Sequence, residues 1–588
     1  MAKIPAALPV AALLLTSACN RNPSDQLAKL SEEFVYTTLS FSPSNATAAG
    51  LHQYKGQNLD DLLDDESPAA IAKQQRFYQG FSDRLGKLDA EKLGPEDRAD
   101  LTILQDQTAL ALQDLTVIHP YLHNPVLYVE TLGNALFSPF VLEYAPKEQR
   151  IQHIIARLQK VPLFLDQAAT NLTASPGIWT QVAQDENAGN IALVDKSIRA
   201  EVPDNLRDAY AKAATPALAA MRKFQDYLKN SLSGRTDADW RLGREKYAAK
   251  FRNTMEAGVE ADNTLEAAER DMQKVRAHML ELALPLHHRM FAGHGEHEGV
   301  AGDDRINLVV GEVLDQIAAD HSTAQSFMDD ARKDLEQARS FVQQKHLLTL
   351  PSQGNLQVIP TPEFMRGAYP VGGFSPAPAL EQQLGAFYWI TPIPPDWPKD
   401  RIESKLREYN NYKLQLLTLH EAMPGHYVQL EYANRVQPAS RRLLRSVFGN
   451  GPYIEGWGQY SEQMMLDEGY LNHAPEFELT FAKEQLRVIA NAILDIRLQM
   501  LNMTDQDALD LMEKQTFQEK EEAVEKLQRA KLGAAQLPTY YVGWNGWLKV
   551  RADYKNAKGS AYSLADFNDR ALQAGSVPLP SLPALLTH

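Results

Sequence analysis

The heptapeptide HEAMPGH, residues 420–426, ends the helical stretch SKLREYNNYKLQLLTLHEAM (404–423) and decides how the chain folds here. It begins like the His-Glu-x-x-His signature, in which two histidines on one helical face bind zinc. In this chain the second histidine stands six residues after the first, about 120° round an ideal helix. A straight helix therefore cannot direct both side chains at one ion.

Pro-Gly, between the two histidines, removes this geometric objection. Pro424 lacks the N–H that would bond to the carbonyl of His420, so the helix is predicted to kink or end there. Gly425 permits the conformations of a tight reversal, which can return His426 towards His420. The same residues are also typical of an ordinary helix C-terminus, where histidine is common and Pro-Gly is a stop signal. On this stretch alone, both interpretations stay open.

A second polar motif follows in GNGPYIEGWGQYSEQMMLDEGY, residues 449–470. Glu455, Gln459 and Glu462 fall at i, i+4 and i+7, on one face of a predicted helix. Two histidines from one helical region and a glutamate from the next form the ligand set of many catalytic zinc peptidases, which leaves a fourth position for water. The sequence thus predicts His420, His426 and Glu455 as zinc ligands.

Two further glutamates complete this prediction. Glu421 adjoins a predicted ligand and is placed as the general base for a water molecule. Glu462 is predicted to support the site from behind the ligands. A solvated helix face is the alternative for Glu455 and Glu462. The large apolar neighbours favour burial instead, and a buried carboxylate requires a partner or a metal; these neighbours are Tyr453, Trp457, Tyr460 and Met464.

Composition excludes one class of function. The chain has 588 residues and a net charge of −16, from 75 acidic and 59 basic residues. A nucleic-acid-binding protein needs a basic surface to neutralise phosphates, so that role is not expected.

The N-terminus, MAKIPAALPVAALLLTSACNRNPSDQ, resembles a secretory signal. Ser17-Ala18-Cys19 resembles a bacterial lipoprotein cleavage box, although Thr16 stands where leucine is usual. We expect a signal peptide over 1–19, a lipid anchor on Cys19, and a location on the periplasmic face of the outer membrane. Ordinary cleavage beside an incidental cysteine is the alternative. Cys19 is the only cysteine, so any metal must be held by His, Asp and Glu.

The rest of the chain is predicted to be mainly helical. A polar tether is expected over 20–30, a mostly helical half over 31–350, and a catalytic half with the metal site over 351–588. The two halves are expected to form one continuous structural unit. Two extended segments interrupt the helical pattern, NLQVIPTP (355–362) and LGAFYWITP (384–392). The second is aromatic and β-branched between Gly385 and Pro392, and it is a predicted strand. No internal repeat is apparent.

The segment LHHRMFAGHGEHEGVAGDD, residues 286–304, also invites a metal interpretation. It contains His287, His288, His294 and His297, but glycines at 293, 295, 299 and 302 predict a mobile surface loop. Such a loop lacks the rigid placement that a selective site needs, so adventitious binding or none is expected.

Four motifs resemble a bacterial family catalogued as domain of unknown function 885. They are LHEAMPGHYVQ (419–429), YIEGWGQYSEQM (453–464), YYVGWNGWLKVR (540–551) and GSVPLPSL (575–582), with FYWITP (387–392) upstream. The resemblance implies a large helical, zincin-like fold with a small sheet beside the active-site helix, and metallopeptidase activity. It also implies Zn²⁺ at His420, His426 and Glu455, Glu421 as base, and Tyr540 as donor to the oxyanion, with Tyr541 as the rival.

One departure and two alternatives remain. Where the family has a histidine shortly after an aspartate, this chain reads LDIRLQM, with Asp495, Arg497 and Gln499, so its specificity or rate can differ. The first hypothesis is a zinc peptidase that cleaves small peptides. The alternatives are a binding or scaffold lipoprotein that has lost its chemistry, and a metal-dependent amidohydrolase that acts on a non-peptide amide.

Overall fold

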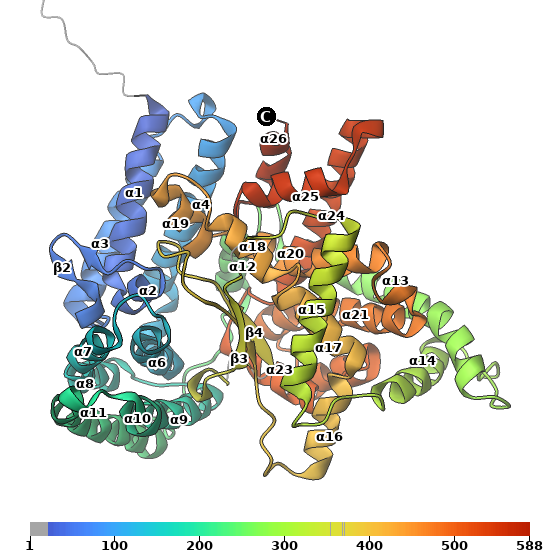
Figure 1. Cartoon of the computed structure of the whole chain (residues 1–588), viewed down its shortest axis with the longest axis horizontal. Helices are drawn as coiled ribbons and strands as arrows, with labels where there is room; N and C mark the ends of the chain where they lie inside the picture. The colour runs from blue at the N-terminus through green and yellow to red at the C-terminus, as the bar shows by residue number, and fades with distance from the viewer. Residues whose placement is uncertain (1–21, 353, 367–368, 370, 588) are drawn as a thin grey trace, which may run out of the picture.

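The computed structural model describes residues 22–352, 354–366, 369 and 371–587. The fold is mainly helical, with one small sheet near the centre of the molecule, so the predicted fold class is confirmed (Figure 1). The predicted signal peptide and Cys19 lie outside the described residues. Within the described ranges, we find no helix with the length and apolarity needed to cross a membrane.

Helices account for most of both halves of the chain. The first half contains α1 (Pro23–Phe41), α2 (Pro43–Ala48), α3 (Pro68–Leu85), α4 (Pro95–Gln113), α5 (Pro120–His123), α6 (Pro125–Val141), α7 (Lys147–Leu158), α8 (Val161–Asn171), α9 (Gly177–Ala192), α10 (Arg199–Glu201), α11 (Arg207–Tyr227), α12 (Gly243–Thr254), α13 (Ala261–Met290), α14 (Gly302–Ala318) and α15 (Phe327–Lys345). The second half contains α16 (Lys399–Glu408), α17 (Asn411–Glu421), α18 (His426–Ala433), α19 (Ala439–Val447), α20 (Gly451–Asp467), α21 (Pro475–Met500), α22 (Asp505–Asp510), α23 (Lys520–Leu532), α24 (Pro538–Lys558), α25 (Leu564–Gln573) and α26 (Leu582–Leu586).

The predicted tether over residues 20–30 is wrong from Pro23 onward. Helix α1 begins at Pro23, and the Asn22 side chain accepts a hydrogen bond from the backbone N–H of Ser24. Leu27, Leu30 and Phe34 then recur at helical spacing and are buried. The polar residues between them made this apolar stripe hard to detect in the sequence. Burial of the stripe holds the segment against the rest of the protein.

The predicted strand and the other extended segment lie in the central sheet, together with a third strand that the sequence did not reveal. β3 (Leu356–Pro360) pairs in parallel with β5 (Ala386–Ile390), and β4 (Gly372–Ser375) pairs antiparallel on the other side of β5. A two-stranded hairpin, β1 (Gln53–Tyr54) and β2 (Gln57–Asn58), lies near the N-terminus.

β5 joins the two halves because its side chains alternate between the faces of the sheet. Phe387 and Trp389 pack with Leu142 just after α6, whereas Tyr388 enters the core that contains Leu419 of α17. The Tyr388 hydroxyl lies 3.2 Å from Oγ1 of Thr418 on α17. The sheet therefore lies directly against the helix that carries His420.

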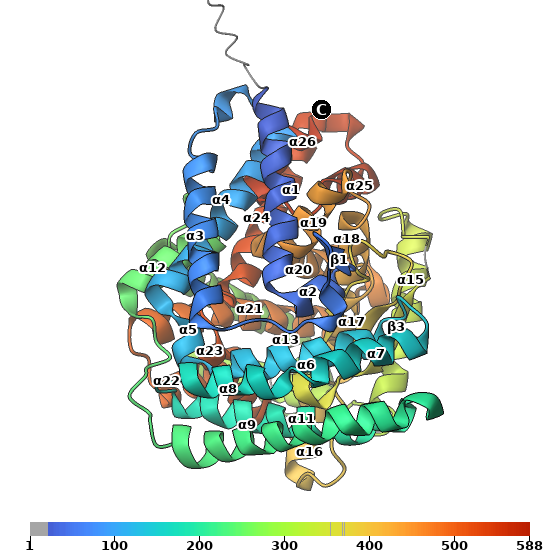
Figure 2. The same ribbon diagram turned by 90° about the vertical axis from the view of Figure 1, so that its left-hand side faces the viewer.

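The two halves of the chain also pack against each other away from the sheet. Figure 2 shows α1, α3 and α4 standing above a layer formed by α6, α7, α8, α9 and α11. On α19, Nε of Arg445 donates to Asp100 of α4 at 2.8 Å, and Arg441 bonds to Asp97 and Asp100. α13 and α14, from the first half, share a core with α21 and α24 from the second. The boundary near residue 350 thus does not separate two independent cores.

Candidate metal centre

The helix that carries His420 ends where the sequence predicted. α17 stops at Glu421, and α18 begins at His426 with Gly425 as its N-cap. A Cβ atom on Gly425 would lie 1.7 Å from the carbonyl oxygen of His420, so only glycine allows the backbone to return this closely. The reversal brings the two imidazole rings to a centroid separation of 4.7 Å, nearly perpendicular at 88°.

Helix α20 holds this reversal in place. Nε1 of Trp457 donates to the carbonyl oxygens of Pro424 at 2.9 Å and of Gly425 at 3.2 Å. One turn of the same helix supplies the space for His420, because a Cβ on Gly458 would lie 2.4 Å from Cε1 of that imidazole. Trp457 is fully buried, so this indole fixes the reversal relative to α20.

Three predicted ligands converge at this point. Oε2 of Glu455 lies 3.6 Å from Nε2 of His420 and 3.5 Å from Nε2 of His426. One ligand atom of each residue lies within 4.8 Å of the other two. In a tetrahedral site with metal–nitrogen distances near 2.1 Å, ligand atoms are separated by about 3.4 Å. The arrangement therefore fits a single ion.

The hydrogen bonding of these atoms also suits a metal. Oε2 of Glu455 is buried and has no hydrogen-bond partner among the described residues, while Gln536 donates to Oε1 at 3.3 Å. Burial would raise the pKa of Glu455, but its interactions with His420 and His426 dominate and hold that pKa well below its usual range. Burial likewise opposes a charge on His420, but Glu455 and Glu462 raise the pKa of His420 to about 10. Glu455 and Glu462 thus stabilise a positive charge at this position, and a metal ion would carry such a charge.

Glu462 orients the first histidine. Its Oε1 lies 2.9 Å from Nδ1 of His420, and the Glu462 side chain is almost completely buried. A proton on Nδ1 that is donated to Glu462 leaves Nε2 as a lone-pair donor facing Glu455. Gln459 donates to the same carboxylate oxygen at 3.2 Å. The face predicted from the spacing of residues 455, 459 and 462 is therefore the face that meets the site.

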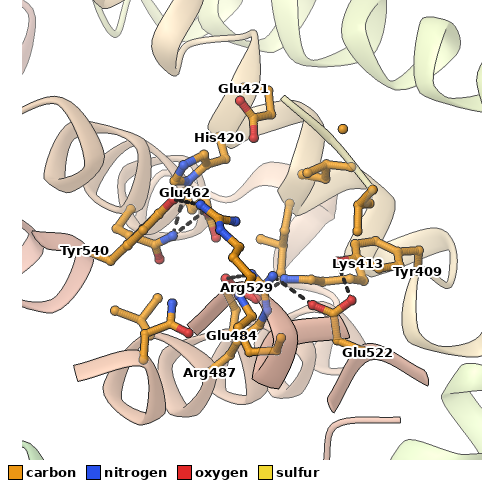
Figure 3. Close-up of a pocket in the computed structure, with 18 of the residues that line it drawn as sticks. Tyr409, Lys413, His420, Glu421, Glu462, Glu484, Arg487, Glu522, Arg529 and Tyr540 are labelled. Carbon is orange, nitrogen blue, oxygen red and sulfur yellow. Dashed lines mark hydrogen bonds and ion pairs between the residues drawn. The ribbon is translucent and has the colours of Figure 1, made fainter. Parts of the chain in front are cut away.

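Glu421 faces the cavity without joining the ligand cluster. It lies in the same pocket as His426, Glu455 and Tyr540, yet it is not part of the group of converging ligand atoms. Its carboxylate makes no hydrogen bond or ion pair with the described residues. This position beside His420 is shown in Figure 3. A free carboxylate here can accept a proton.

The two adjacent tyrosines in the first turn of α24 point to different surroundings. The Tyr540 ring stacks near His420, with centroids 6.0 Å apart and an interplanar angle of 24°. Burial, with Glu455 nearby, raises the pKa of Tyr540 to about 12, so its hydroxyl remains a donor at neutral pH. The Tyr541 hydroxyl donates to Asp271 of α13 at 2.7 Å, away from His420. The close contact of Gly456 with Gly543 brings α24 this near to α20.

Two cavities meet at the site. One, of about 730 Å³, is lined by His420 and continues towards α21 and α23; the other, of about 1320 Å³, is lined by His426 and Glu455. Their linings share Gly372, Glu421, Arg529 and Tyr540.

The smaller cavity contains charged residues that the sequence analysis missed. Lys413 and Arg487 both form ion pairs with Glu484, and Arg487 also pairs with Glu522. Figure 3 shows Arg529 between this cluster and Tyr540. Nη2 of Arg529 lies 3.4 Å from the Tyr540 hydroxyl.

Two basic residues of this cavity form no ion pair with a carboxylate of the described residues, Arg529 and the buried Lys526. Burial and the neighbouring Arg487 and Arg529 hold the pKa of Lys526 well below its usual range, so only Arg529 is an unpaired cation. Glu522, Lys526 and Arg529 recur at i, i+4 and i+7 along α23, which was the available signal. In the sequence alone, that pattern is the same as an ordinary solvated helix face.

The departure from the family pattern lies at the end of α21. Arg497 pairs with Glu269 at 2.6 Å, and Gln499 bonds to the backbone of Leu242 and of Gly533. Asp495 lines the larger cavity, and burial raises its pKa to about 7.

The sequence profile of one family covers most of the chain. The family described as "Bacterial protein of unknown function (DUF885)" matches residues 43–586. No curated protein matches the chain.

Solved structures of similar fold include two proteins of bacterial origin. A candidate lipoprotein of unknown function from Shewanella oneidensis is 27% identical, with a TM-score of 0.76, and the match covers 96% of this chain and 100% of that one. A candidate lipoprotein from Colwellia psychrerythraea is 17% identical, also with a TM-score of 0.76, over 96% and 99%. Metallocarboxypeptidase 1 of Trypanosoma cruzi is 9% identical over 96% of each chain, with a TM-score of 0.40, a likeness too low to support an argument.

Proposed function

The chain belongs to the bacterial DUF885 family, and we propose that it is a zinc-dependent peptidase that hydrolyses small peptides. The observation that carries this proposal is the convergence of His420, His426 and Glu455 around a buried, unpartnered carboxylate oxygen, with the free Glu421 beside them. Three protein ligands and an open position are the arrangement of catalytic rather than structural zinc sites.

The chain's own residues supply the remaining chemistry. His420, His426 and Glu455 would hold the ion, which when bound polarises a carbonyl and lowers the pKa of water. Glu421 would take a proton from the attacking water and later return it to the leaving amine. Tyr540, protonated at neutral pH, would donate a hydrogen bond to the oxyanion as it forms.

The first test is chemical and needs no variant. The purified protein is expected to contain about one zinc at this centre and to cleave members of a mixed library of short peptides, detected by mass spectrometry. Treatment with a chelator should abolish cleavage, because the ion provides the charge stabilisation, and added zinc should restore it. Stoichiometric metal without cleavage of any peptide or amide would instead support a binding or scaffold protein. Cleavage of non-peptide amides alone would support the amidohydrolase alternative.

The smaller cavity narrows the substrate class within this proposal. Arg529 is a cation that forms no ion pair with a carboxylate of the described residues, and charges are rarely left unpaired in such surroundings. A carboxylate on the substrate would supply the missing partner, while the rest of the peptide occupies the larger cavity. We therefore propose that the substrate presents a carboxylate, such as its C-terminus, to Arg529.

Arg529→Gln tests this assignment. Wild-type protein should cleave a peptide with a free C-terminus about 10- to 100-fold better in kcat/KM than the same peptide with a C-terminal amide, because a hydrogen bond to a charged group contributes about 1.5–3 kcal/mol. The variant should lose that preference through a higher KM for the acid, with its metal content unchanged.

Matched substrates provide the control for Arg529. A peptide with an internal aspartate and an amidated end distinguishes a side-chain carboxylate from the C-terminus. Equal cleavage of the acid and the amide by the wild type would contradict the proposal. An equal fall in kcat for both substrates in the variant would also do so, since it would place Arg529 on the oxyanion.

We also propose that the chain is exported and anchored by a lipid on Cys19, on the periplasmic face of the outer membrane. The structural relatives from Shewanella and Colwellia are described as candidate lipoproteins, which supports an anchored protein. Asn20 follows the cysteine, in place of the aspartate that commonly retains lipoproteins in the inner membrane.

A further inference from the structure

The histidine-rich segment 286–304, which includes the end of α13 and the connection to α14, differs from its predicted character. A mobile loop without rigid placement was expected, yet the fold gathers three of the four histidines of this segment around one carboxylate, Glu312 of α14. This connection lies at the right-hand edge of the molecule in Figure 1, remote in sequence from the centre at His420. Glu312 follows the last of these histidines by 15 residues, so the spacing in the sequence did not indicate that it joins them.

All three imidazoles present Nε2 to the same oxygen. Oε2 of Glu312 lies 2.7 Å from Nε2 of His287, 3.2 Å from that of His297 and 3.4 Å from that of His294. The three rings have pairwise centroid separations of 5.0 to 6.0 Å. The edge of a tetrahedral zinc site is about 3.3 Å, so these four side chains already stand near the positions of a complete ligand set.

The backbone of the connection is specialised for this convergence. Gly293 has a φ of 86°, a left-handed conformation that lets the chain turn back after α13. His297 itself has a φ of 54°, which is uncommon for a residue with a side chain and costs free energy unless its surroundings fix it. The glycine that suggested mobility thus provides the turn that presents His294.

The anchor of the cluster is buried. His287 is 0% exposed at the end of α13, and its hydrogen-bond partner in the described structure is Glu312. His294 and His297 close the cluster from the solvent side. His288, the neighbour of His287, is exposed and does not take part. Burial tends to raise the pKa of Glu312, but His287 and His297 lower it, so the carboxylate is ionised and available as a ligand.

We propose that His287, His294, His297 and Glu312 form a second metal site, separate from the catalytic centre and selective for a divalent transition metal such as Zn²⁺. Three imidazoles and a carboxylate suit zinc and its neighbours, and four protein ligands make a closed, structural site. The ion would join the 291–301 connection to α13 and α14. The proposal does not depend on hydrolytic activity.

The test is a zinc titration of the metal-free mature protein, with bound metal counted by elemental analysis after gel filtration. The wild type is expected to bind two equivalents, and His294→Ala and His297→Ala one each, because each substitution removes a partly exposed ligand. His288→Ala is the matched control and should still bind two. The site can be isolated in a His426→Ala background, where one equivalent should remain and should disappear when His294→Ala is added.

A second readout reports on the loop itself. Zinc should slow proteolysis within residues 291–301 in the wild type and in His288→Ala but not in His294→Ala. Folding is followed by circular dichroism, and His297→Ala provides an independent variant if His294→Ala is unstable. If the wild type and both variants bind the same number of ions, the cluster is only a hydrogen-bonded set of histidines around Glu312, and the proposal is wrong. That outcome would leave the catalytic centre untouched.

Discussion

Glu421→Gln is expected to lower turnover by about two orders of magnitude or more, because glutamine keeps the shape of the side chain but cannot accept a proton. Glu421 makes no hydrogen bond or ion pair with the described residues, and its carboxylate lies outside the converging ligand atoms. The substitution should therefore leave zinc content and the thermal unfolding temperature close to the wild-type values. Peptide hydrolysis, elemental analysis and thermal denaturation measure the three quantities.

A matched surface variant separates this effect from a general change of charge. Glu266→Gln, on an exposed position of α13, should retain full activity. Full hydrolytic activity in Glu421→Gln would show that the proposed mechanism is wrong. Loss of zinc together with activity would instead make Glu421 a ligand, and the roles along residues 420–426 would have to be reassigned.

His426→Ala should remove the catalytic ion altogether. The variant keeps His420 and Glu455, but two ligands do not hold a labile divalent ion at stoichiometric occupancy. A bound metal supplies several kcal/mol of charge stabilisation, and each 1.36 kcal/mol is a factor of ten in rate, so activity should fall by about 10³-fold or more. Metal is counted at this centre, in the same assay as for the wild type.

His278→Ala, an exposed histidine of α13, is the control and should keep both its metal and its activity. The outcome against the proposal is full occupancy of the catalytic centre in His426→Ala. The Pro-Gly reversal would then serve the fold alone, and His426 would be an ordinary residue at the start of α18.

The conformation of the segment 420–426 was largely predictable because its signals are local. Proline and glycine act on the backbone within a few residues, so the end of α17 and the reversal at Gly425 follow from stereochemistry. The face of α20 follows from helical periodicity. Strand β5 was also predictable, since LGAFYWITP is aromatic and β-branched between turn residues, as buried strands are.

Features that depend on distant contacts were missed. β4 has the sequence GGFS and becomes a strand because the edge of β5 is there to pair with it. The first part of helix α1, residues 23–30, was interpreted as a tether because polar residues separate its apolar side chains.

The same limit applies to the charged groups. That Arg529 forms no ion pair with a carboxylate could be known only after α17, α21 and α23 were placed together. The contact of Glu312 with three histidines likewise depends on the turn at Gly293, which the sequence did not reveal. A polar residue on a helix is a functional candidate only when its neighbours in space are known, and the sequence does not give those.

The indole bond from Trp457 to the Pro424 and Gly425 carbonyls has a consequence for how the ion is acquired. Because this bond and the tight contact at Gly425 do not involve the metal, the loop that bears His426 is ordered before any ion arrives. The conformational entropy of fixing the ligands is thus lost during folding and does not weaken binding later. Metal-dependent domains such as zinc fingers couple folding to binding and collapse without their ion. If the chain binds zinc as proposed, we expect the opposite order here: the ligands are positioned by folding, and the ion enters a site that is already formed.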